Sequence, residues 1–375
     1  MVTQLEFLMK TKDEIQNEAL EALNKFDKGA AAISMGVGKT KLGLMHMKSK
    51  FTDYSKFLVV APKLSIFQSW KDDAEKFGYD YLLDHIEFST YLSLHKQDND
   101  YDIIYLDECH SLTEKSDEYL DNHTGSIIGL TGTYPKRGDK LKRLIRYCPV
   151  RYTYVVDDAV TDKILNDYEI KVHLLPLDTK NTVPVKGKFG NFYTSEVKQN
   201  SYWNKRINAE QNKKSLQFLR IMRMKALMSF PSKENYVRKL LRESTNKCIV
   251  FANTQEQADK LCNYSYHSGN KLSEDNLRLF KEGVIKKLSC VHQLSEGVTI
   301  PDLKEAIIMH SYGGSSAKTN QRMGRALRLN PDDKATVHIL CYEGTSDEKW
   351  VNDSISNLDK SKIEYISLTQ TSLDL

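Results

Sequence analysis

Short apolar runs recur along the chain, and polar or turn-forming residues close each of them. Strands of a parallel sheet have this pattern, because helices cover both faces of the sheet. Amphipathic segments lie between the runs; residues 12–26, for example, place Ile15, Ala19 and Leu23 on one face of a helix. This alternation predicts an α/β fold with parallel sheets. The predicted strands are 30–33, 57–62, 85–88, 101–106, 126–130, 171–177, 248–252, 288–294, 306–310 and 336–342.

The length of 375 residues predicts two domains with separate cores. An acidic, loop-like stretch at 155–167 marks the junction, so the first domain is expected at 1–157 and the second at 168–375. Between about 182 and 232, basic residues outnumber acids and aromatic residues lie among them. We interpret this stretch as a basic, helical insertion in the second domain. It either binds a nucleic-acid strand or packs its aromatic residues against that domain.

Composition narrows the class of protein. The 40% hydrophobic and 28% charged residues are typical of a soluble globular protein. The net charge of +4 is small, so any nucleic-acid binding would need local basic patches. Six scattered cysteines without a C-x-x-C pair predict neither a zinc site nor a disulfide framework, and favour a reducing, intracellular location. Residues 1–14 do not resemble a signal peptide, and no apolar run has the length of a membrane span, so no membrane partner is expected.

The segment 34–40, Ser-Met-Gly-Val-Gly-Lys-Thr, lies between a predicted strand and a predicted helix. Such a loop wraps phosphates, because Gly36 and Gly38 let the backbone approach them and the helix N-terminus adds partial positive charge. Lys39 would reach the β- and γ-phosphates, and the Thr40 hydroxyl would bind Mg²⁺. The segment therefore predicts a site for ATP and Mg²⁺.

An acid pair follows the predicted strand 101–106. Asp107 would hold Mg²⁺, and Glu108 would orient or deprotonate the attacking water. A strand followed by an acidic turn is the alternative interpretation. The order of a phosphate loop first and an acid pair at a later strand end favours the catalytic one. The loop Thr131-Gly132-Thr133 follows the next strand and would couple the γ-phosphate to domain motion.

Three further features have two interpretations each. Arg325 and Arg328 lie three residues apart on a predicted helix, where they either reach the γ-phosphate or form salt bridges. The basic run 136–151 is either a solvated helix face or a face that follows phosphates. Gln16 could read an adenine edge, but by itself it is better interpreted as a surface residue on a helix.

The motifs form an ordered set: Gln16, SMGVGKT, VVAPKLSIFQSW, DECH, LTGT, CIVFANT, LSEGVTIP and QRMGRALR. Together they resemble the two-lobed core of superfamily-2 helicases and translocases, over nearly the whole chain. The resemblance implies two RecA-like lobes, with ATP between them and nucleic acid across both. Two positions depart from the family pattern, since Ile33 replaces the first glycine of the phosphate loop and Thr299 stands where an acid or asparagine is common.

By position, the resemblance implies a role for each matching residue. The implied catalytic residues are Lys39, Asp107, Glu108, Gln321, Arg325 and Arg328. The implied nucleotide-binding residues are Gln16, Gly36, Val37, Gly38, Lys39, Thr40 and Gly297, with Thr40 and Asp107 on the metal. The predicted nucleic-acid contacts are Pro62, Lys63, Thr90, Thr131, Thr133, Lys205, Arg206 and His267.

The acid box reads DECH and the coupling loop Thr-Gly-Thr, which favours DNA translocases over RNA helicases. The phrases at 231–233, 294–297 and 345–350 are similar to phage-encoded repair helicases of the UvsW type. We therefore expect an ATP-dependent DNA helicase or translocase that remodels branched DNA, by fork regression or branch migration, in the bacterial cytoplasm or an infected host. An RNA helicase or transcript-release ATPase is one alternative. A non-catalytic module that binds nucleic acid or a nuclease partner is another. The oligomeric state is not predicted.

Overall fold

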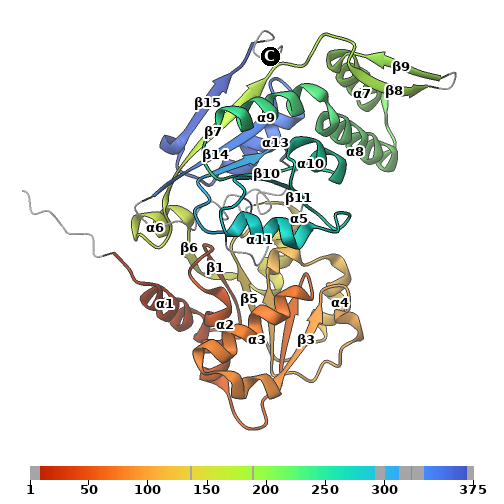
Figure 1. Ribbon diagram of the computed structural model, residues 1–375. Helices are drawn as coiled ribbons and strands as arrows, with labels where there is room; N and C mark the ends of the chain where they lie inside the picture. Colours follow the sequence, from red (N-terminus) through yellow and green to blue (C-terminus); the bar gives the residue numbers. More distant parts are fainter. Residues whose placement is uncertain are drawn as a thin grey trace, which may run out of the picture. The chain divides into compact units, whose positions relative to one another are not determined.

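The computed structural model describes residues 9–135, 137–187, 190–291, 300–311, 322 and 333–369. The chain divides into two compact units, Met1–Leu165 and Asn166–Leu375, which we call lobe 1 and lobe 2 (Figure 1). This division lies inside the stretch 155–167 in which the sequence places the junction. Each lobe has its own parallel sheet and its own buried core, so the predicted α/β class with two lobes is confirmed.

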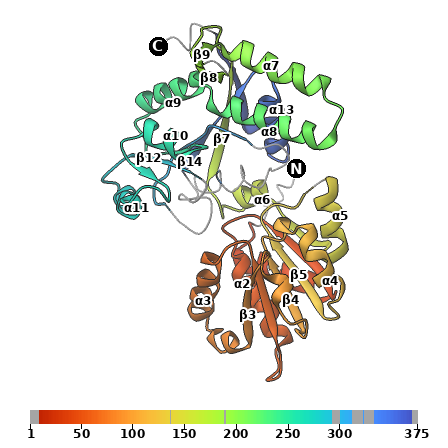
Figure 2. The ribbon, with the colours of Figure 1, turned by 90° about the vertical axis from the view of Figure 1, so that its right-hand side faces the viewer.

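Lobe 1 is a six-stranded parallel sheet with the order β3-β2-β4-β5-β1-β6 (Figure 2). Its strands are β1 (Lys28–Ile33), β2 (Phe57–Ala61), β3 (Ile86–Thr90), β4 (Ile103–Asp107), β5 (Ser126–Thr131) and β6 (Val150–Tyr154). Its helices are α1 (Lys12–Asn24), α2 (Lys39–Lys50), α3 (Ser65–Phe77), α4 (Asp117–Asp121), α5 (Gly138–Tyr147) and α6 (Val156–Thr161), with short 3-10 turns η1 (Asp80–His85), η2 (Leu94–Lys96), η3 (Cys109–Ser111) and η4 (Glu114–Ser116). Every residue of β2 and β4 is buried, as their continuous apolar sequences predict.

The start of α1 is fixed by its sequence. The Thr11 hydroxyl accepts from the backbone N–H of Glu14, and the Glu14 carboxylate accepts from the backbone N–H of Thr11 at 2.7 Å. This capping box satisfies donors that the first turn of a helix leaves open. The predicted apolar face of α1 is buried, with Ile15, Ala19 and Leu23 fully covered.

Lobe 2 is a seven-stranded parallel sheet with the order β11-β12-β10-β13-β14-β7-β15. Its strands are β7 (Asp167–Leu175), β10 (Cys248–Phe251), β11 (Ser265–Tyr266), β12 (Lys287–Cys290), β13 (Glu305–Ile308), β14 (Lys334–Tyr342) and β15 (Ile363–Ser367). Its helices are α9 (Pro231–Glu243), α10 (Gln255–Leu261), α11 (Ser273–Lys281) and α13 (Ser346–Ile355), with a 3-10 turn η6 (Lys360–Lys362). No helix in the described parts of the chain has the length and apolar character needed to cross a membrane.

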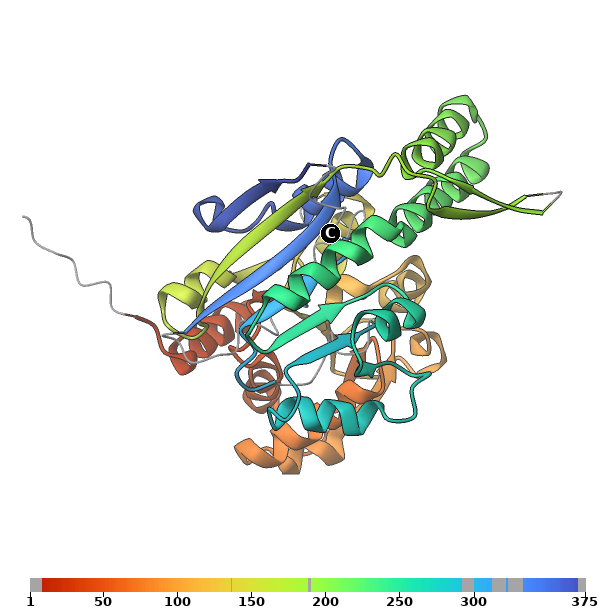
Figure 3. The ribbon, with the colours of Figure 1, turned by 45° about the horizontal axis from the view of Figure 1, so that its top comes forward.

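The predicted insertion forms an arm on lobe 2. The arm comprises an antiparallel hairpin, β8 (Val183–Gly187) and β9 (Gly190–Thr194), and two helices, α7 (Glu196–Ala209) and α8 (Lys213–Ser229). In Figure 3 the hairpin and helices extend away from the sheet of lobe 2. The helices were expected from the sequence, whereas the hairpin was not.

Buried charges hold the root of the arm. The Glu196 carboxylate, at the start of α7, accepts from the backbone N–H groups of Asp178 and Ser232 at 2.9 and 3.0 Å. Next to it, Lys233 and Asp347 form an ion pair at 2.6 Å with both side chains almost fully buried. Two of the phrases that carry the sequence resemblance, 231–233 and 345–350, therefore meet in space at this root.

Two predictions about local structure are wrong. Residues 150–154 form strand β6, although the basic run 136–151 was interpreted as one helix, and residues 156–161 of the expected junction loop form α6. The strands β6 and β15 lie at sheet edges, pair with one neighbour each and keep polar residues exposed. Edge strands of this kind lack the continuous apolar run that identifies a buried strand.

Two histidines stack in the core of lobe 2. His173 on β7 and His338 on β14 have nitrogens 2.9 Å apart, and the other His173 nitrogen lies 3.0 Å from the Tyr236 hydroxyl. Burial, together with the neighbouring His338 and Lys171, lowers the pKa of His173 from 6.5 to about 3. The folded protein therefore keeps this ring neutral at mildly acidic pH.

We expect the stability of the protein to fall as the pH drops below about 6.5, because the unfolded chain then takes up protons that folded His173 does not. The stability from the neutral ring is fully present above this pH, and about 2 kcal/mol of it is lost at about pH 5. Urea unfolding of wild type and His173→Gln at neutral and acidic pH measures this. The variant should show a weaker pH dependence, and His95→Gln, at an exposed site, should behave as wild type. An equal decline in all three proteins would contradict the prediction.

Candidate active site

Three predicted motifs lie side by side at one edge of the sheet in lobe 1. The phosphate loop follows β1, the acid pair ends β4, and the loop Thr131–Thr133 follows β5, which lies between those two strands. Parallel strands present their carboxyl ends at the same edge, where α/β proteins bind their ligands. The fold therefore brings together residues that are far apart in the sequence.

The phosphate loop has the backbone that its glycines predict. Gly36 and Gly38 have φ angles of 87° and 95°, a left-handed conformation that other residues rarely adopt. A Cβ atom at Gly38 would also lie 2.7 Å from Nε2 of Gln16. Helix α2 begins at Lys39, directly after Gly38, so the loop ends at a helix N-terminus as anion binding requires.

Gln16 lies against this loop. Its side chain is 2% exposed, and its Nε2 donates to the carbonyl oxygen of Val37 at 2.5 Å. Its Oε1 is buried and has no hydrogen-bond partner among the described residues. The interpretation of Gln16 as a surface residue is therefore wrong, and its buried acceptor oxygen lies beside the phosphate loop without a described partner.

Glu108 is held in an unusual backbone conformation next to a lysine. Its φ angle is 48°, and its carboxylate lies 3.5 Å from Nζ of Lys39 and 3.3 Å from Nδ1 of His110. The backbone N–H of Gly132 also donates to it. Burial opposes ionisation of Glu108, but Lys39 and His110 outweigh this effect and hold its pKa below the usual value. Backbone strain of this kind is concentrated at functional sites.

Asp107 has a different environment from its neighbour. Its Oδ2 accepts from the indole N–H of Trp70 at 2.9 Å, and its Oδ1 accepts from the backbone N–H of Glu108 at 2.9 Å. Burial and the adjacent Glu108 charge raise the pKa of Asp107. Lys39 and His110 thus lie beside Glu108, whereas the hydrogen bonds of Asp107 come from neutral donors, and a cation beside Asp107 would relieve this imbalance.

A histidine that the sequence analysis did not select links the acid pair to the coupling loop. Nδ1 of His110 lies 2.9 Å from Oγ1 of Thr131, and Thr131 in turn bonds both the carbonyl and the N–H of Thr133 at 3.0 and 3.1 Å. Thr131 is fully buried. The prediction that Thr131 contacts nucleic acid is therefore wrong, whereas its predicted coupling role has a physical path through His110 to Glu108.

The oxygen donors for a hard cation are few. Besides Asp107, the Thr40 hydroxyl is present at the start of α2, near the Asp73 carboxylate. Within the described residues, no three His, Cys, Asp or Glu side chains are grouped as a metal-binding cluster. Mg²⁺ does not require such a cluster, because it commonly takes one or two protein oxygens and completes its shell with phosphates and water.

The other predicted site residues fall into three groups. Lys63, Lys205 and Arg206 are exposed, and Pro62, Thr90 and Thr133 are partly exposed, as a contact surface requires. His267 is 3% exposed and its Nε2 lies 2.8 Å from Asp259, so the prediction that it contacts nucleic acid is wrong. Gly297, Gln321, Arg325 and Arg328, together with Thr299, lie outside the described residues.

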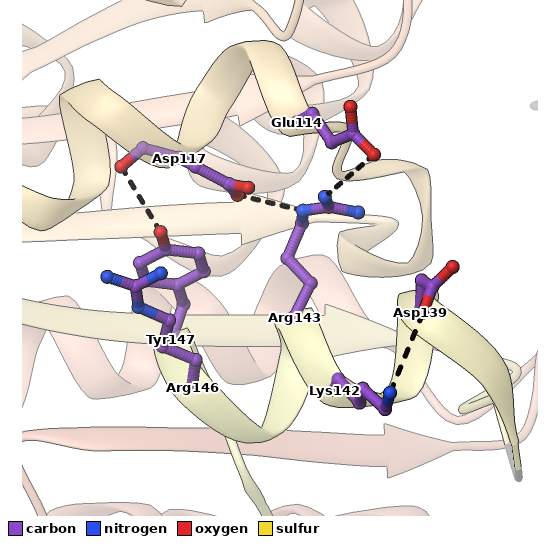
Figure 4. A pocket seen from close by; sticks show the side chains of 7 residues that line it. All are labelled: Glu114, Asp117, Asp139, Lys142, Arg143, Arg146 and Tyr147. Carbon is purple, nitrogen blue, oxygen red and sulfur yellow. Dashed lines mark hydrogen bonds and ion pairs between the residues drawn. The ribbon is translucent and has the colours of Figure 1, made fainter.

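A separate cavity of about 320 Å³ lies between η4, α4 and α5 (Figure 4). Its lining is charged, and two arginines in the lining form ion pairs. Arg143 pairs with Asp117 at 2.8 Å, and Arg146 pairs with Asp121 at 2.7 Å. For these two arginines the structure favours a solvated helix face over a face that follows phosphates. The cavity lining contains none of the predicted site residues.

Two family models match the chain. The one described as "Type III restriction enzyme, res subunit" matches residues 3–136, and the one described as "Helicase conserved C-terminal domain" matches residues 232–330. These matches fall on lobe 1 and lobe 2, in the order that the motifs predict. The chain has a superfamily-2 helicase core.

Relatives of this helicase core include a DNA 3'-5' translocase XPB2 of Sulfurisphaera tokodaii. It is 25% identical, over 91% of this chain and 84% of the relative. The fold is similar to the restriction-modification enzyme LlaBIII bound to DNA, with a TM-score of 0.61, 14% identity, and coverage of 96% of this chain but only 31% of that one. It is also similar to S. cerevisiae Dbp5 bound to RNA and ADP BeF3, with a TM-score of 0.56, 12% identity, and coverage of 96% and 90%. The helicase core and the family matches make the protein a nucleic-acid-dependent ATPase.

Replacing Glu108 with glutamine should slow ATP hydrolysis by about 100-fold or more, because the amide cannot accept a proton from water. Nucleotide binding should persist, since Lys39 and the glycine loop are unchanged. Phosphate release and binding of a fluorescent ATP analogue measure the two effects. Glu118→Gln, an exposed acid on α4, is the matched control. Hydrolysis by Glu108→Gln at the wild-type rate would remove Glu108 from the mechanism.

Proposed function

We propose that this protein is an ATP-dependent DNA translocase that uses Mg²⁺ and remodels branched DNA, by fork regression or branch migration. The relative named as a DNA translocase supports DNA as the substrate. The coupling loop and the acid box of lobe 1 support the same class. The six free cysteines fit a reducing compartment, and we include a cytoplasmic location in the proposal.

Lobe 1 would supply most of the chemistry. Lys39 now pairs with Glu108. A γ-phosphate would compete for the same lysine, and Glu108 would then be released to orient water. Thr40 and Asp107 would hold Mg²⁺, which when bound neutralises charge on the phosphates. His110 and Thr131 would carry the change at Glu108 to the loop that ends at Thr133.

Lobe 2 would complete the site and move the strand. Arg325 and Arg328 fit the role of arginine fingers, because arginine offers a charged, planar fork to the transferring phosphate. Cycles of ATP binding and hydrolysis would then alternate the grip of the two lobes on the backbone. Backbone contacts carry little sequence information, so binding should depend on structure and salt more than on sequence.

The observation that carries the proposal is the charge of the arm. Residues 182–232 contain ten basic and two acidic residues, a net charge of +8, whereas the whole chain has +4. The rest of the chain is therefore net negative. One of the two acids, Glu196, is buried at the root. Within the described residues 190–229, no basic side chain forms a salt bridge, and all of them except Arg223 are exposed, so most of the positive charge of the arm faces solvent. A polyanion such as DNA is the partner that this surface fits.

Exposed aromatic side chains accompany this charge. Phe192 and Tyr193 on β9 are 53% and 66% exposed, and Tyr202 on α7 and Phe218 on α8 are 49% and 61% exposed. Bases of unpaired strands stack on such side chains. The alternative that these four residues pack the insertion against its lobe is not supported, because they remain largely in solvent. Unpaired strands occur where branched DNA opens.

Nucleic acid should stimulate ATP hydrolysis, with forks and four-way junctions stimulating more than linear duplex. Rates measured with single strands, duplex, fork, four-way junction and RNA, at two salt concentrations, test this. Lys39→Ala should abolish hydrolysis on every substrate, and Lys41→Ala, whose lysine pairs with Asp13 away from Glu108, should not. Stimulation by RNA above DNA would instead favour an RNA helicase. DNA-stimulated hydrolysis by Lys39→Ala would contradict the proposal.

Neutralising the arm should weaken DNA binding and make it less sensitive to salt. Each phosphate contact contributes about one to the slope of log affinity against log salt. We expect Lys205→Gln with Arg206→Gln to reduce the slope by about two if both contact phosphates. The matched control is Lys260→Gln with Arg278→Gln, which removes the same charge from exposed sites on lobe 2 that pair with acids. Equal effects of the two double variants would exclude a specific role for the arm.

A further inference from the structure

Helix α3 contacts both residues that would hold the metal. Trp70 on α3 donates its indole N–H to Oδ2 of Asp107 at 2.9 Å. Asp73, one helical turn later, has its pKa raised by burial, and the nearby Thr40 hydroxyl acts in the opposite direction. Residues three apart lie on the same helix face. One face of α3 thus reaches the end of β4 and the start of α2 together.

Trp70 is fixed in this position by packing. Its side chain is fully buried, and a Cβ atom on Gly43 of α2 would collide with Cη2 of its ring. The absence of a side chain at Gly43 therefore lets the indole lie between α2 and β4. A buried indole N–H normally requires an acceptor, and here the acceptor is the carboxylate of Asp107.

Asp107 is also fixed through its main chain. The Tyr91 hydroxyl donates to the backbone carbonyl of Asp107 at 2.7 Å. Tyr91 follows β3 and Trp70 follows β2, and both strands lie on the same side of β4 in the sheet. The tyrosine therefore holds the main chain of Asp107, and the tryptophan orients its side chain.

We infer that Trp70 and Asp73 are positioning residues that set the Asp107 carboxylate and the Thr40 hydroxyl for Mg²⁺. This inference rests on the proposed function, because it requires the ATP and Mg²⁺ site of lobe 1. With one carboxylate oxygen taken by the indole and the other by the backbone N–H of Glu108, the orientation of Asp107 is determined before any metal binds. Outer partners of metal ligands act in this way, and their loss commonly weakens metal affinity 10- to 100-fold.

A spectroscopic test uses the fact that the chain has three tryptophans, Trp70, Trp203 and Trp350. In a chain that retains only Trp70, Mn²⁺ with a non-hydrolysable ATP analogue should quench the emission, because paramagnetic Mn²⁺ quenches fluorophores at short range. Mg²⁺ with the same analogue should not. Binding of the analogue without any Mn²⁺ effect on Trp70 would overturn the inference.

A binding test removes the two contacts. Trp70→Phe and Asp73→Ala should each weaken Mn²⁺ binding in the presence of the analogue by about 10-fold, measured as free Mn²⁺ by electron paramagnetic resonance. Binding of the analogue without metal should be unchanged. Asp72→Ala, an exposed acid beside Asp73 on the same helix, is the control and should bind Mn²⁺ as wild type does.

Trp70→Phe and Asp73→Ala differ in the risk that the substitution prevents folding. Trp70 is in the core, so urea unfolding should verify that Trp70→Phe folds, whereas Asp73 is only partly buried and its variant should fold in any case. Wild-type affinity for Mn²⁺ in both variants would overturn the inference. A wild-type protein that binds no nucleotide at all would instead contradict the proposed function.

Discussion

The lobe 1 site depends on an unequal division of charge between two adjacent carboxylates: partly buried Glu108 lies beside Lys39 and His110, whereas buried Asp107 accepts hydrogen bonds from neutral donors. Lys39 approaches Glu108, and Asp107 is left with dipoles, namely the Trp70 indole and a backbone N–H. Buried charges without partners are costly, so the surrounding structure must hold this arrangement in place. The left-handed backbone of Glu108, the buried Trp70 and the Tyr91 bond all serve that purpose. A bound cation would supply the positive charge that Asp107 lacks.

Lobe 2 has an excess of positive charge on its arm. Its arm concentrates basic residues that repel one another, and no salt bridge within its described part compensates them. Such an arm needs a firm attachment, and Glu196 provides it by accepting backbone N–H groups from two separate segments. The buried pair Lys233–Asp347 extends this attachment to α13. Breaking one member of such a pair is far more destabilising than the pair is stabilising, which fits a role in fixing geometry.

Sequence patterns predicted the strands whose consecutive residues are buried, because such strands have continuous apolar sequences. The strands β2, β4 and β10 are buried, apolar and easily recognised. The edge strands β6 and β15 and the β8–β9 hairpin were missed, because their residues are largely polar or exposed. The phosphate loop and the acid pair were predicted from spacing, and the structure brings them together. Gln16, His110 and Trp70 depend on contacts 21 or more residues away, which no local pattern reveals. His267 was predicted to contact nucleic acid, but its side chain is buried.

The two imbalances suggest why ATP and nucleic acid would act together. The lobe 1 site has an excess of buried negative charge and is completed by a cation with its nucleotide, whereas the arm has an excess of exposed positive charge and is completed by a polyanion. Helix α3 begins two residues after Lys63, an exposed predicted strand contact, and its middle turns carry Trp70, which bonds Asp107, and Asp73, which lies near Thr40. A strand that displaces the start of α3 would therefore move Trp70 and Asp73, and with them the metal ligands. Stimulation of hydrolysis by nucleic acid would then need no contact between the strand and the nucleotide.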